Sequence, residues 1–318
     1  MPKTHRLDPT PETVHWGYFD ASLPARIEIE SGDTVVVDTV SGWPGVAPDA
    51  SYSAAHREIF TKVKQELGAH ILTGPVAVRG ARPGDTLEVR IKNIELTADW
   101  GWNVIRPLRG TLPEDFPNFE HRTLPIDREK MRAKLPWGPS VPLSPFFGIL
   151  ATAPRPEYGR ISSVEPREFG GNMDCKEFVP GTSLFLPVFV PGANFSAGDG
   201  HAVQGDGEVC LTALETCLRG TFELVVHKNV KLALPRAVTP THYIALGLDA
   251  DLDDAAKQAL REMIAWLVAM FGWTRSEAYV FCSLACDLHV TQLVDGIKGV
   301  HAMVSRDVVS RSSVSNMQ

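Results

Sequence analysis

Short apolar runs separated by glycine and proline are the feature of this sequence that most restricts its fold. Up to about residue 230, these runs are only a few residues long and rich in β-branched side chains. Residues 26–30 alternate between apolar and polar side chains, and residues 34–40 follow the turn residues Gly32 and Asp33. Such alternation between turn residues is typical of half-buried β-strands. We therefore expect sheets to form the larger part of the chain.

A second turn of the same kind precedes another expected strand. Gly84 and Asp85 lead into residues 86–95, whose apolar positions alternate with a slip near the end. This recurrence fits an internal structural repeat, and it fits equally well the ordinary chemistry of Gly-Asp turns. Further strands are expected at residues 184–190, 209–214 and 222–226.

Residues 106–160 differ from the rest because many prolines interrupt them. Regular structure is hard to sustain at that spacing of prolines. The segment also contains several aromatic residues, so two interpretations stay open. It could form a wall or lid over a small pocket, or an arm that packs on a neighbouring molecule. We prefer the arm.

Helices are expected in the C-terminal part of the chain. Apolar residues recur there with the helical period up to about residue 271, and Asp253 or Asp254 can cap the start of this helix. Thr274 and Glu277 then form a capping-box pattern, which predicts a second helix over residues 275–286.

Residues 287–294 alternate like the earlier runs and are expected to return to a strand. The whole pattern predicts a β-rich α+β fold, with sandwich-like or barrel-like sheets and a few C-terminal helices. We expect a single domain over residues 1–318, which could also consist of two intimate β-rich subdomains over about residues 1–160 and 161–318.

The formal net charge of −7 argues against a nucleic-acid partner, because such a partner requires a basic face. No apolar run approaches the roughly 20 residues of a membrane span, and the N-terminal residues lack the apolar core of a signal peptide. We therefore expect a cytoplasmic protein without a nucleic-acid or membrane partner. The five cysteines form no C-x-x-C pair, which fits that compartment, and Cys282 and Cys286 are expected to be buried thiols.

The densest group of polar residues is interleaved with four glycines and contains Asp199, His201, Asp206 and Glu208. Carboxylate and imidazole groups together suit a divalent metal, and glycine lets the backbone approach a ligand closely. If residues 206–210 are extended, Asp206 and Glu208 lie on the same face of the strand. The alternative is a solvated acidic hairpin loop with an incidental histidine.

Weaker candidates lie elsewhere in the chain. Asn172 and Asp174 follow a Gly-Gly pair, although both are common turn residues. His70 precedes a Gly-Pro turn, where a lone histidine is more often structural. Glu215 ends an apolar run and is either a surface charge or, if buried, a general base with a raised pKa. The sequence lacks the motifs of serine nucleophiles, of phosphate-binding loops and of H-E-x-x-H zinc sites.

Five blocks of the sequence share a pattern with one known family. They are Thr-Val-His-Trp-Gly-Tyr-Phe-Asp at 13–20, Ile-Glu-Ser-Gly-Asp-Thr-Val at 29–35, His-Ile-Leu-Thr-Gly-Pro-Val at 70–76, Gly-Asn-Met-Asp at 171–174 and Asp-Gly-His-Ala-Val-Gln-Gly-Asp-Gly-Glu-Val at 199–209. Through these blocks the chain resembles the acetamidase/formamidase family from about residue 10 to residue 300. The last block is the most specific.

The resemblance implies an oligomeric, β-rich enzyme that hydrolyses small linear amides, such as formamide and acetamide, to ammonia and a carboxylate. It also implies a bound divalent metal, which is often Zn²⁺, and Ca²⁺ is the other ion considered. We expect this metal to activate the attacking water. Catalytic zinc sites use three protein ligands and one open position. We expect His70, Asp174 and His201 as the ligands, with Asp199 in reserve.

The remaining roles follow from the needs of amide hydrolysis. Glu215 is expected to act as general base and acid, with Asn172 and Gln204 orienting the amide or the oxyanion. Leu211 and His289 depart from the pattern of the family, and they leave the identity of the amide open.

Two other classes of protein stay as alternatives. A non-haem iron oxygenase would also use two histidines and a carboxylate, but the H-x-H signature of such hairpins is missing from the sequence. A non-catalytic, calcium-stabilised binding module would use the oxygen ligands of the same region. Oxygen dependence or bound calcium without ammonia release would favour these alternatives.

Overall fold

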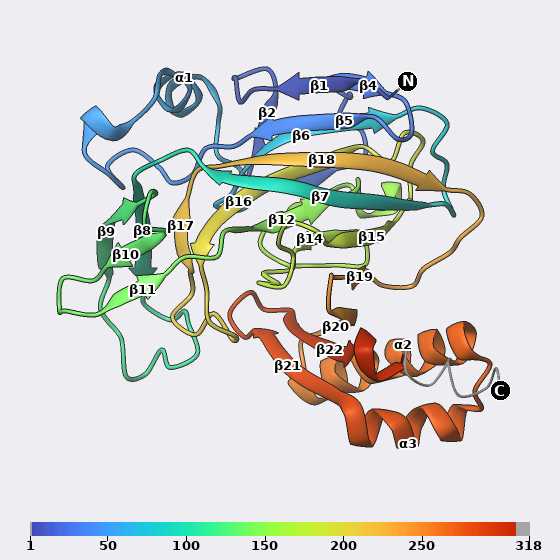
Figure 1. Cartoon of the computed structure of the whole chain (residues 1–318). Coiled ribbons are helices and arrows are strands. Elements are labelled where there is room, and N and C mark those ends of the chain that lie inside the picture. The colour runs from blue at the N-terminus through green and yellow to red at the C-terminus, as the bar shows by residue number, and fades with distance from the viewer. Residues whose placement is uncertain (1, 310–318) are drawn as a thin grey trace.

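Two large sheets form most of the computed structural model, which describes residues 2–309 (Figure 1). Within these residues the first sheet has nine strands. In spatial order they are β1 (Thr4–Leu7), β5 (Thr34–Asp38), β18 (Leu218–His227), β7 (Thr86–Leu96), β15 (Ser183–Pro187), β19 (Arg236–Val238), β20 (His242–Asp249), β22 (Lys298–Ser305) and β21 (Cys286–Gln292). The first sheet therefore combines strands from distant parts of the chain.

The second sheet has eleven strands in the described part of the chain. Its main path runs through β11 (Ser140–Pro142), β10 (Arg132–Lys134), β9 (Glu120–Asp127), β8 (Trp100–Ile105), β17 (Leu214–Thr216), β16 (Phe195–Val203), β12 (Phe146–Ala151) and β14 (Gly170–Asn172). The strand β6 (Ile71–Val78) joins this path at β16 and also pairs with β2 (Val14–Trp16) and β4 (Ile27–Ile29). A small separate sheet pairs β13 (Arg160–Ser162) with β3 (Tyr18–Asp20). The expected β-rich fold with large sheets is confirmed.

The main core lies where the two sheets face each other. Side chains alternate between buried and partly exposed along β18, as expected for a strand with one face on a core. Phe222 of β18 is fully buried, and its ring packs edge-on against Phe147 of β12 and Phe195 of β16. Each such aromatic pair contributes about 0.5–1.5 kcal/mol beyond the buried area. This core holds the strands of the second sheet in place beneath the site described below.

The two Gly-Asp turns are built in the same way. Asp33 and Asp85 each accept a hydrogen bond on the carboxylate from the backbone N–H three residues earlier, at Glu30 and Arg82. The strands that follow them, β5 and β7, lie on either side of β18. The slip expected near the end of residues 86–95 is confirmed, because the register of β7 and β18 shifts beside Phe222.

The long helix α2 (Leu252–Phe271) packs on β20 and β22 of the first sheet (Figure 1). Its N-cap is Asp251, so the prediction of Asp253 or Asp254 was wrong. The carboxylate of Asp251 accepts hydrogen bonds from the backbone N–H of Asp253 and of Asp254, which places those two residues inside the first turn. A Cβ on Gly247 of β20 would lie 2.0 Å from a backbone oxygen of α2, so glycine permits this close packing.

The C-terminal helix and strand follow the sequence-based expectations. Thr274 and Glu277 form the predicted capping box at the start of α3 (Arg275–Ala285). The strand β21 begins at Cys286 and covers most of the expected segment. The shorter helices are α1 (Ala54–Lys62), η1 (Asp49–Ser51) and η2 (Pro156–Tyr158). Among the described residues, no helix is long and apolar enough to cross a membrane.

The strand expected at residues 209–214 is wrong, because a turn occupies most of it. The backbone N–H of Leu211 donates to the carbonyl oxygen of Glu208 at 3.1 Å, and both residues have positive φ angles of 114° and 45°. The strand β17 starts only at Leu214. Asp206 and Glu208 consequently do not share a strand face, in contrast to the expectation for an extended segment.

The expectation that residues 106–160 lack regular structure is also wrong, because β9 to β12 lie there. Proline has no backbone N–H to donate to a neighbouring strand, so in a sheet it is confined to positions where that hydrogen bond is not needed. In β9, Pro125 lies outside the pairing with β10, which involves only Ile126 and Asp127. Pro142 ends β11, the strand at the edge of the second sheet.

Candidate active site

Four strands of the second sheet bring the predicted site residues to one place. Asp199 and His201 lie on β16, and Glu215 lies on the neighbouring strand β17 directly opposite His201. Asp174 follows the end of β14, and His70 immediately precedes β6. The strands β12 and β6 both pair with β16. Their neighbouring segments therefore bring Asp174 and His70 close to the residues of β16.

The imidazole of His201 is at the centre of the site and is fully buried. Its Nε2 lies 3.1 Å from Asp199 Oδ2, 3.2 Å from Glu215 Oε2 and 3.9 Å from Asp174 Oδ1. One N–H can satisfy only one of these carboxylates by a well-aligned hydrogen bond. The arrangement therefore concentrates more negative charge than His201 alone can balance.

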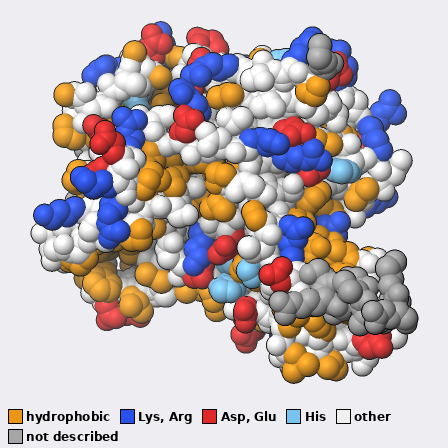
Figure 2. All heavy atoms as spheres, viewed as in Figure 1, with side chains coloured by type: hydrophobic (Ala, Val, Ile, Leu, Met, Phe, Trp, Pro, Cys, Tyr) orange, Lys and Arg blue, Asp and Glu red, His pale blue; other side chains and the backbone are white. Residues whose placement is uncertain are grey.

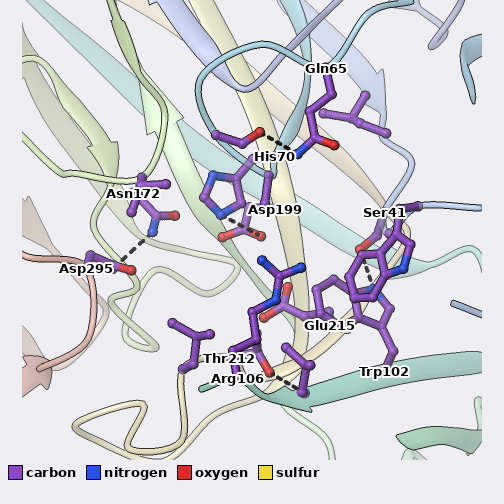
Figure 3. A pocket seen from close by; sticks show the side chains of 18 of the residues that line it. Ser41, Gln65, His70, Trp102, Arg106, Asn172, Asp199, Thr212, Glu215 and Asp295 are labelled. Atoms are coloured by element: carbon purple, nitrogen blue, oxygen red, sulfur yellow. Dashed lines mark hydrogen bonds and ion pairs between the residues drawn. The ribbon is translucent and has the colours of Figure 1, made fainter. Parts of the chain in front are cut away.

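His70 approaches the same carboxylates from the edge of β6. Its Nε2 lies 4.0 Å from Asp199 Oδ1, and its Nδ1 lies 2.9 Å from the hydroxyl of Ser163. Figure 3 shows the ring of His70 facing Asp199 inside the cavity. Of the four residues expected to bind a metal, Asp174, Asp199 and His201 thus lie together, and His70 joins them at the edge through Asp199.

The backbone beneath the cluster leaves almost no free space. A Cβ on Gly148 of β12 would lie 2.5 Å from both Asp174 Oδ1 and Asp199 Oδ2. Asp174 and Asp199 also have positive φ angles of 51° and 56°, which L-residues rarely adopt. Strained backbone of this kind gathers at functional sites, where the surrounding structure supports it.

Gln204 holds His201 in one orientation. Its Oε1 lies 2.9 Å from His201 Nδ1, and its Nε2 donates to the backbone oxygen of Asp174 at 2.9 Å. The donation to Asp174 fixes which end of the amide faces His201. Because a carbonyl oxygen only accepts, Nδ1 of His201 carries a proton and Nε2 points at the carboxylates.

Asn172 and Asp295 form the opposite wall. The Nδ2 of Asn172 donates to Asp295 Oδ2 at 3.0 Å, as the dashed line between them in Figure 3 marks. Asp295 lies in the turn between β21 and β22 and was not predicted, because no pattern around it differs from an ordinary turn. Glu208 was predicted only as a neighbour of Asp206, but it is buried and can share a cation with Asp174 and His201.

Burial raises the pKa of most carboxyl groups in the cluster. The pKa of Glu215 is raised to about 7 by burial, against the opposing charge of His201. Burial also raises the pKa of Asp295 to about 7. For Asp174 and Glu208, burial and the neighbouring carboxylates raise the pKa well above the usual range. Such shifts are typical of functional sites.

Asp199 and His201 respond in the opposite way. Burial would raise the pKa of Asp199, but the charges of His70 and His201 outweigh it and hold the pKa below its usual range. Burial would lower the pKa of His201, but the carboxylates of Glu215 and Asp199 outweigh it and raise that pKa. In the absence of another cation, a proton on His201 therefore balances the charge of Asp199.

Unpartnered oxygen atoms remain in this buried cluster. Within the described residues, both carboxylate oxygens of Asp174 and the Oδ1 of Asn172 lack a hydrogen-bond partner. A buried polar atom without a partner costs about 1–3 kcal/mol, so native proteins keep few of them. These atoms consequently indicate a group that the protein binds.

A cavity of about 280 Å³ opens above the cluster and is lined by His70, Asn172, Asp199 and Glu215. Its outer wall includes Trp43, Trp102 and Arg106, and the guanidinium of Arg106 lies 5.5 Å from the ring of Trp43. Figure 3 shows Arg106 and Trp102 on the side of the cavity that carries Glu215. The first residues of the proline-rich segment thus contribute to the wall of this cavity.

Comparison with known proteins gives a consistent result. The model of the Acetamidase/Formamidase family matches residues 4–161 and 157–305. A formamidase of Methylophilus methylotrophus is 24% identical, over 86% of this chain and 84% of its own length. A sequence-predicted formamidase of Schizosaccharomyces pombe is 26% identical over 65% of this chain, and the match spans 62% of that protein.

A solved structure agrees with these sequence matches. The acetamidase of Bacillus halodurans superposes with a TM-score of 0.83 at 30% identity, covering 96% of this chain and 99% of that one. The likeness extends over both large sheets and the C-terminal helices, because nearly the whole of each chain is aligned.

Proposed function

The chain belongs to the acetamidase/formamidase family, and we propose that it hydrolyses the carbon–nitrogen bond of a small linear amide and releases ammonia. The observation that carries this proposal is the buried cluster around His201, which opens into a cavity of about 280 Å³. A cavity of this size admits a small amide with room to spare, so its volume sets no sharp limit on the acyl group. The chemistry of the cluster therefore supports amide hydrolysis, whereas the identity of the amide is left to the activity assay.

The donor atoms of the cluster fit a divalent cation. Gln204 keeps the proton of His201 on Nδ1, so Nε2 faces the carboxylates of Asp174, Asp199 and Glu215. A lone pair pointing at carboxylates is stable only if a proton or a metal ion lies between them. The oxygens of Asp174, which lack a hydrogen-bond partner among the described residues, also support a bound cation.

We assign His70, Asp174 and His201 as the residues that would hold this ion, with Asp199 as the alternative ligand. Nitrogen and oxygen ligands together favour Zn²⁺, whereas a site made of oxygen ligands alone would favour Ca²⁺. When bound, such an ion acts as a Lewis acid that polarises the amide carbonyl and makes water more acidic.

Glu215 is the proposed general base and acid. Its Oε1 accepts a hydrogen bond from the backbone N–H of Ala213 at 2.9 Å, so Oε2 is the oxygen that can exchange a proton. Burial raises the pKa of Glu215 to about 7, which lets the side chain accept and return a proton near neutral pH. It would take a proton from the attacking water and give it to the departing nitrogen.

Asn172 and Gln204 have different roles in this proposal. Asp295 engages the Nδ2 of Asn172, which leaves Oδ1 as an acceptor for an N–H of the substrate amide. Both ends of the Gln204 amide bond to the protein, so Gln204 is a positioning residue that orients His201. Such a contact to the second nitrogen of a metal-binding histidine fixes the orientation of its ring.

Ammonia release from formamide, acetamide and propionamide tests the proposal. We expect turnover that falls after the metal is removed with a chelator and returns when Zn²⁺ or Ca²⁺ is restored, which also identifies the ion. His201→Ala should lose both the bound metal and the activity. The side chain of His227 does not line the cavity, so His227→Ala should keep both. Full metal content and full activity in His201→Ala would contradict the assignment of ligands.

The proposal also includes a homo-oligomer, as the family resemblance implies, and a cytoplasmic location, as expected from the composition of the sequence. Apolar side chains of α3 support an association between copies, since Val280 and Leu284 are 58% and 81% exposed. Large exposed apolar residues in a group are typical of protein contacts. Light scattering on the purified chain gives the mass in solution, and a monomer at micromolar concentration would contradict this part of the proposal.

A further inference from the structure

A pair of histidines lies on the two C-terminal strands, away from the cavity. His289 of β21 and His301 of β22 are direct partners across the antiparallel strands. Their rings are 5.1 Å apart and almost parallel, with an angle of 12° between the planes. Directly opposite residues of an antiparallel pair project to the same face, with Cβ atoms about 4.5–5.5 Å apart. Two imidazoles are thus available on one side of this sheet.

A carboxylate from the second sheet reaches the same place. The loop after β16 is attached to β21, because the backbone N–H of Gly207 donates to the oxygen of Thr291 and the N–H of Leu293 donates to the oxygen of Gly207, both at 3.1 Å. This attachment places Asp206 Oδ2 3.2 Å from His289 Nδ1. One donor atom each of Asp206, His289 and His301 lie within 4.8 Å of one another.

His301 carries a nitrogen that nothing in the described part of the chain satisfies. The side chain is fully buried, and its Nδ1 lies 2.7 Å from the hydroxyl of Thr291. Its Nε2 has no hydrogen-bond partner among residues 2–309. Metal-binding histidines commonly keep one nitrogen hydrogen-bonded in this way and use the other for the ion. The unpartnered Nε2 is therefore the observation that indicates a missing ligand.

We propose that Asp206, His289 and His301 bind a divalent transition-metal ion of the Zn²⁺ class. Two imidazoles and one carboxylate form a donor set that favours such an ion over Ca²⁺ or Mg²⁺. This second site does not depend on the proposed amidase function, because it shares no ligand with the cluster around His201. Figure 2 shows histidine side chains at the surface beside acidic and basic ones, where the C-terminal part meets the rest.

Lys176 controls access to this second site. Its Nζ lies 2.9 Å from Asp206 Oδ2, and its side chain is 34% exposed. An ammonium group in this position competes with an incoming cation for the same carboxylate. Because the long side chain reaches solvent, it can swing away when the ion binds. Removal of the positive charge of Lys176 should therefore strengthen the binding of the metal.

The bound ion would connect the two large sheets. Asp206 belongs to the loop that follows β16 of the second sheet, whereas the histidines belong to β21 and β22 of the first. The loop also contains Gln204, whose Nε2 contacts the backbone oxygens of Asp174 and of Thr291 at 2.9 and 3.4 Å. A ligand that binds only the folded state stabilises it by mass action, so the melting temperature should rise with the concentration of the ion.

The test is equilibrium dialysis of the full-length chain against Zn²⁺, with the bound metal counted per chain and the melting temperature measured in parallel. We expect His289→Ala to bind one equivalent less than the unaltered chain and to lose the corresponding rise in melting temperature. His242→Ala is the matched control, because His242 is a partly exposed strand histidine whose imidazole bonds the hydroxyl of the adjacent Thr241. Lys176→Met should bind the extra equivalent about five- to tenfold more tightly.

The outcomes separate this site from the active site. Asp174→Asn should impair ammonia release and yet retain the equivalent that His289→Ala removes. An unchanged stoichiometry in His289→Ala, or an equal loss in His242→Ala, would overturn the proposal. If His289→Ala did not fold, Lys176→Met would decide alone, and unaltered or weaker Zn²⁺ binding by that variant would also overturn it.

Discussion

His201 and Glu215 face each other directly across β16 and β17, with 3.2 Å between Nε2 of the imidazole and Oε2 of the carboxylate. The register of the two strands creates this contact, because fourteen positions separate the residues in the sequence. The other oxygen of Glu215 is held by the backbone N–H of Ala213. The proton that Glu215 exchanges is consequently on the side of His201 and the cavity.

Replacement of Glu215 by glutamine should abolish most of the turnover without a change in fold. The amide keeps an oxygen for the N–H of Ala213 but cannot act as a base, so we expect kcat to fall about 10²- to 10⁴-fold. KM should change much less. Steady-state ammonia release measures both constants, and Glu223→Gln on β18 is the matched control. A variant that retained more than a tenth of kcat would rule out Glu215 as the base.

Alanine at Gly148 should disrupt the cluster locally. The new Cβ would lie 2.5 Å from carboxylate oxygens of Asp174 and Asp199, so one of them must move. We expect metal content and activity to fall at least tenfold, while far-ultraviolet circular dichroism stays unchanged. Gly205→Ala is the control, because a Cβ there meets nothing within 4 Å. Equal metal content in the two variants would contradict the crowded arrangement.

Methionine at Gln204 should weaken the cluster through the orientation of His201. The change removes the acceptor for His201 Nδ1 and the donor to the backbone oxygen of Asp174. Loss of such a supporting contact typically costs 10- to 100-fold in metal affinity or activity. Metal affinity measured by competition with a chelator is the informative quantity, since a role in general stability alone would leave it unchanged. Gln258→Met on α2 is the control.

Acid should destabilise the protein partly through His15. This buried imidazole bonds the backbone oxygen of Tyr18, and burial lowers its pKa from 6.5 to about 4. Between these two values the unfolded chain binds the proton and the folded chain does not, so stability present above pH 6.5 is lost as the pH falls toward 4. The linkage corresponds to roughly 3 kcal/mol over this interval.

Urea unfolding at pH 7.5, 6 and 5 measures this contribution. His15→Gln should be less stable at pH 7.5, because the variant loses buried contacts, but its stability should fall less steeply with acid. His5→Gln, at a partly exposed position bonded to Asp33, is the comparison. Parallel losses in His15→Gln and the unaltered chain between pH 6 and 5 would show that His15 does not titrate as described.

Local patterns predicted the elements whose stability is local. The capping box of Thr274 and Glu277 spans a single helical turn, so four residues of sequence are enough to place the start of α3. The Gly-Asp turns before β5 and β7 are closed by hydrogen bonds between residues three apart. Residues 209–214 misled the prediction, because a short, mostly apolar run resembles a strand even where the hydrogen bond from Leu211 to Glu208 closes a turn.

The site residues also differ in whether neighbouring sequence or tertiary structure places them. Asp199, His201 and Gln204 lie close together in one block, and Asn172 and Asp174 in another, so their chemical character was readable before the fold was known. The burial of Glu208 and the arrival of Asp295 beside Asn172 could not be read in this way. Both depend on which loops close over the end of the second sheet.

The sequence by itself determined the β-rich class, the C-terminal helices and the residue types from which a metal-binding cluster could be built. Only the tertiary structure decided that His70, Asp174, His201 and Glu215 converge, and that Asp206 turns away from them toward His289 and His301. The physical reason is the separation along the sequence of the residues that make each contact. Turns and caps are closed by bonds between near neighbours, whereas these contacts depend on strand registers and sheet packing that no short segment encodes.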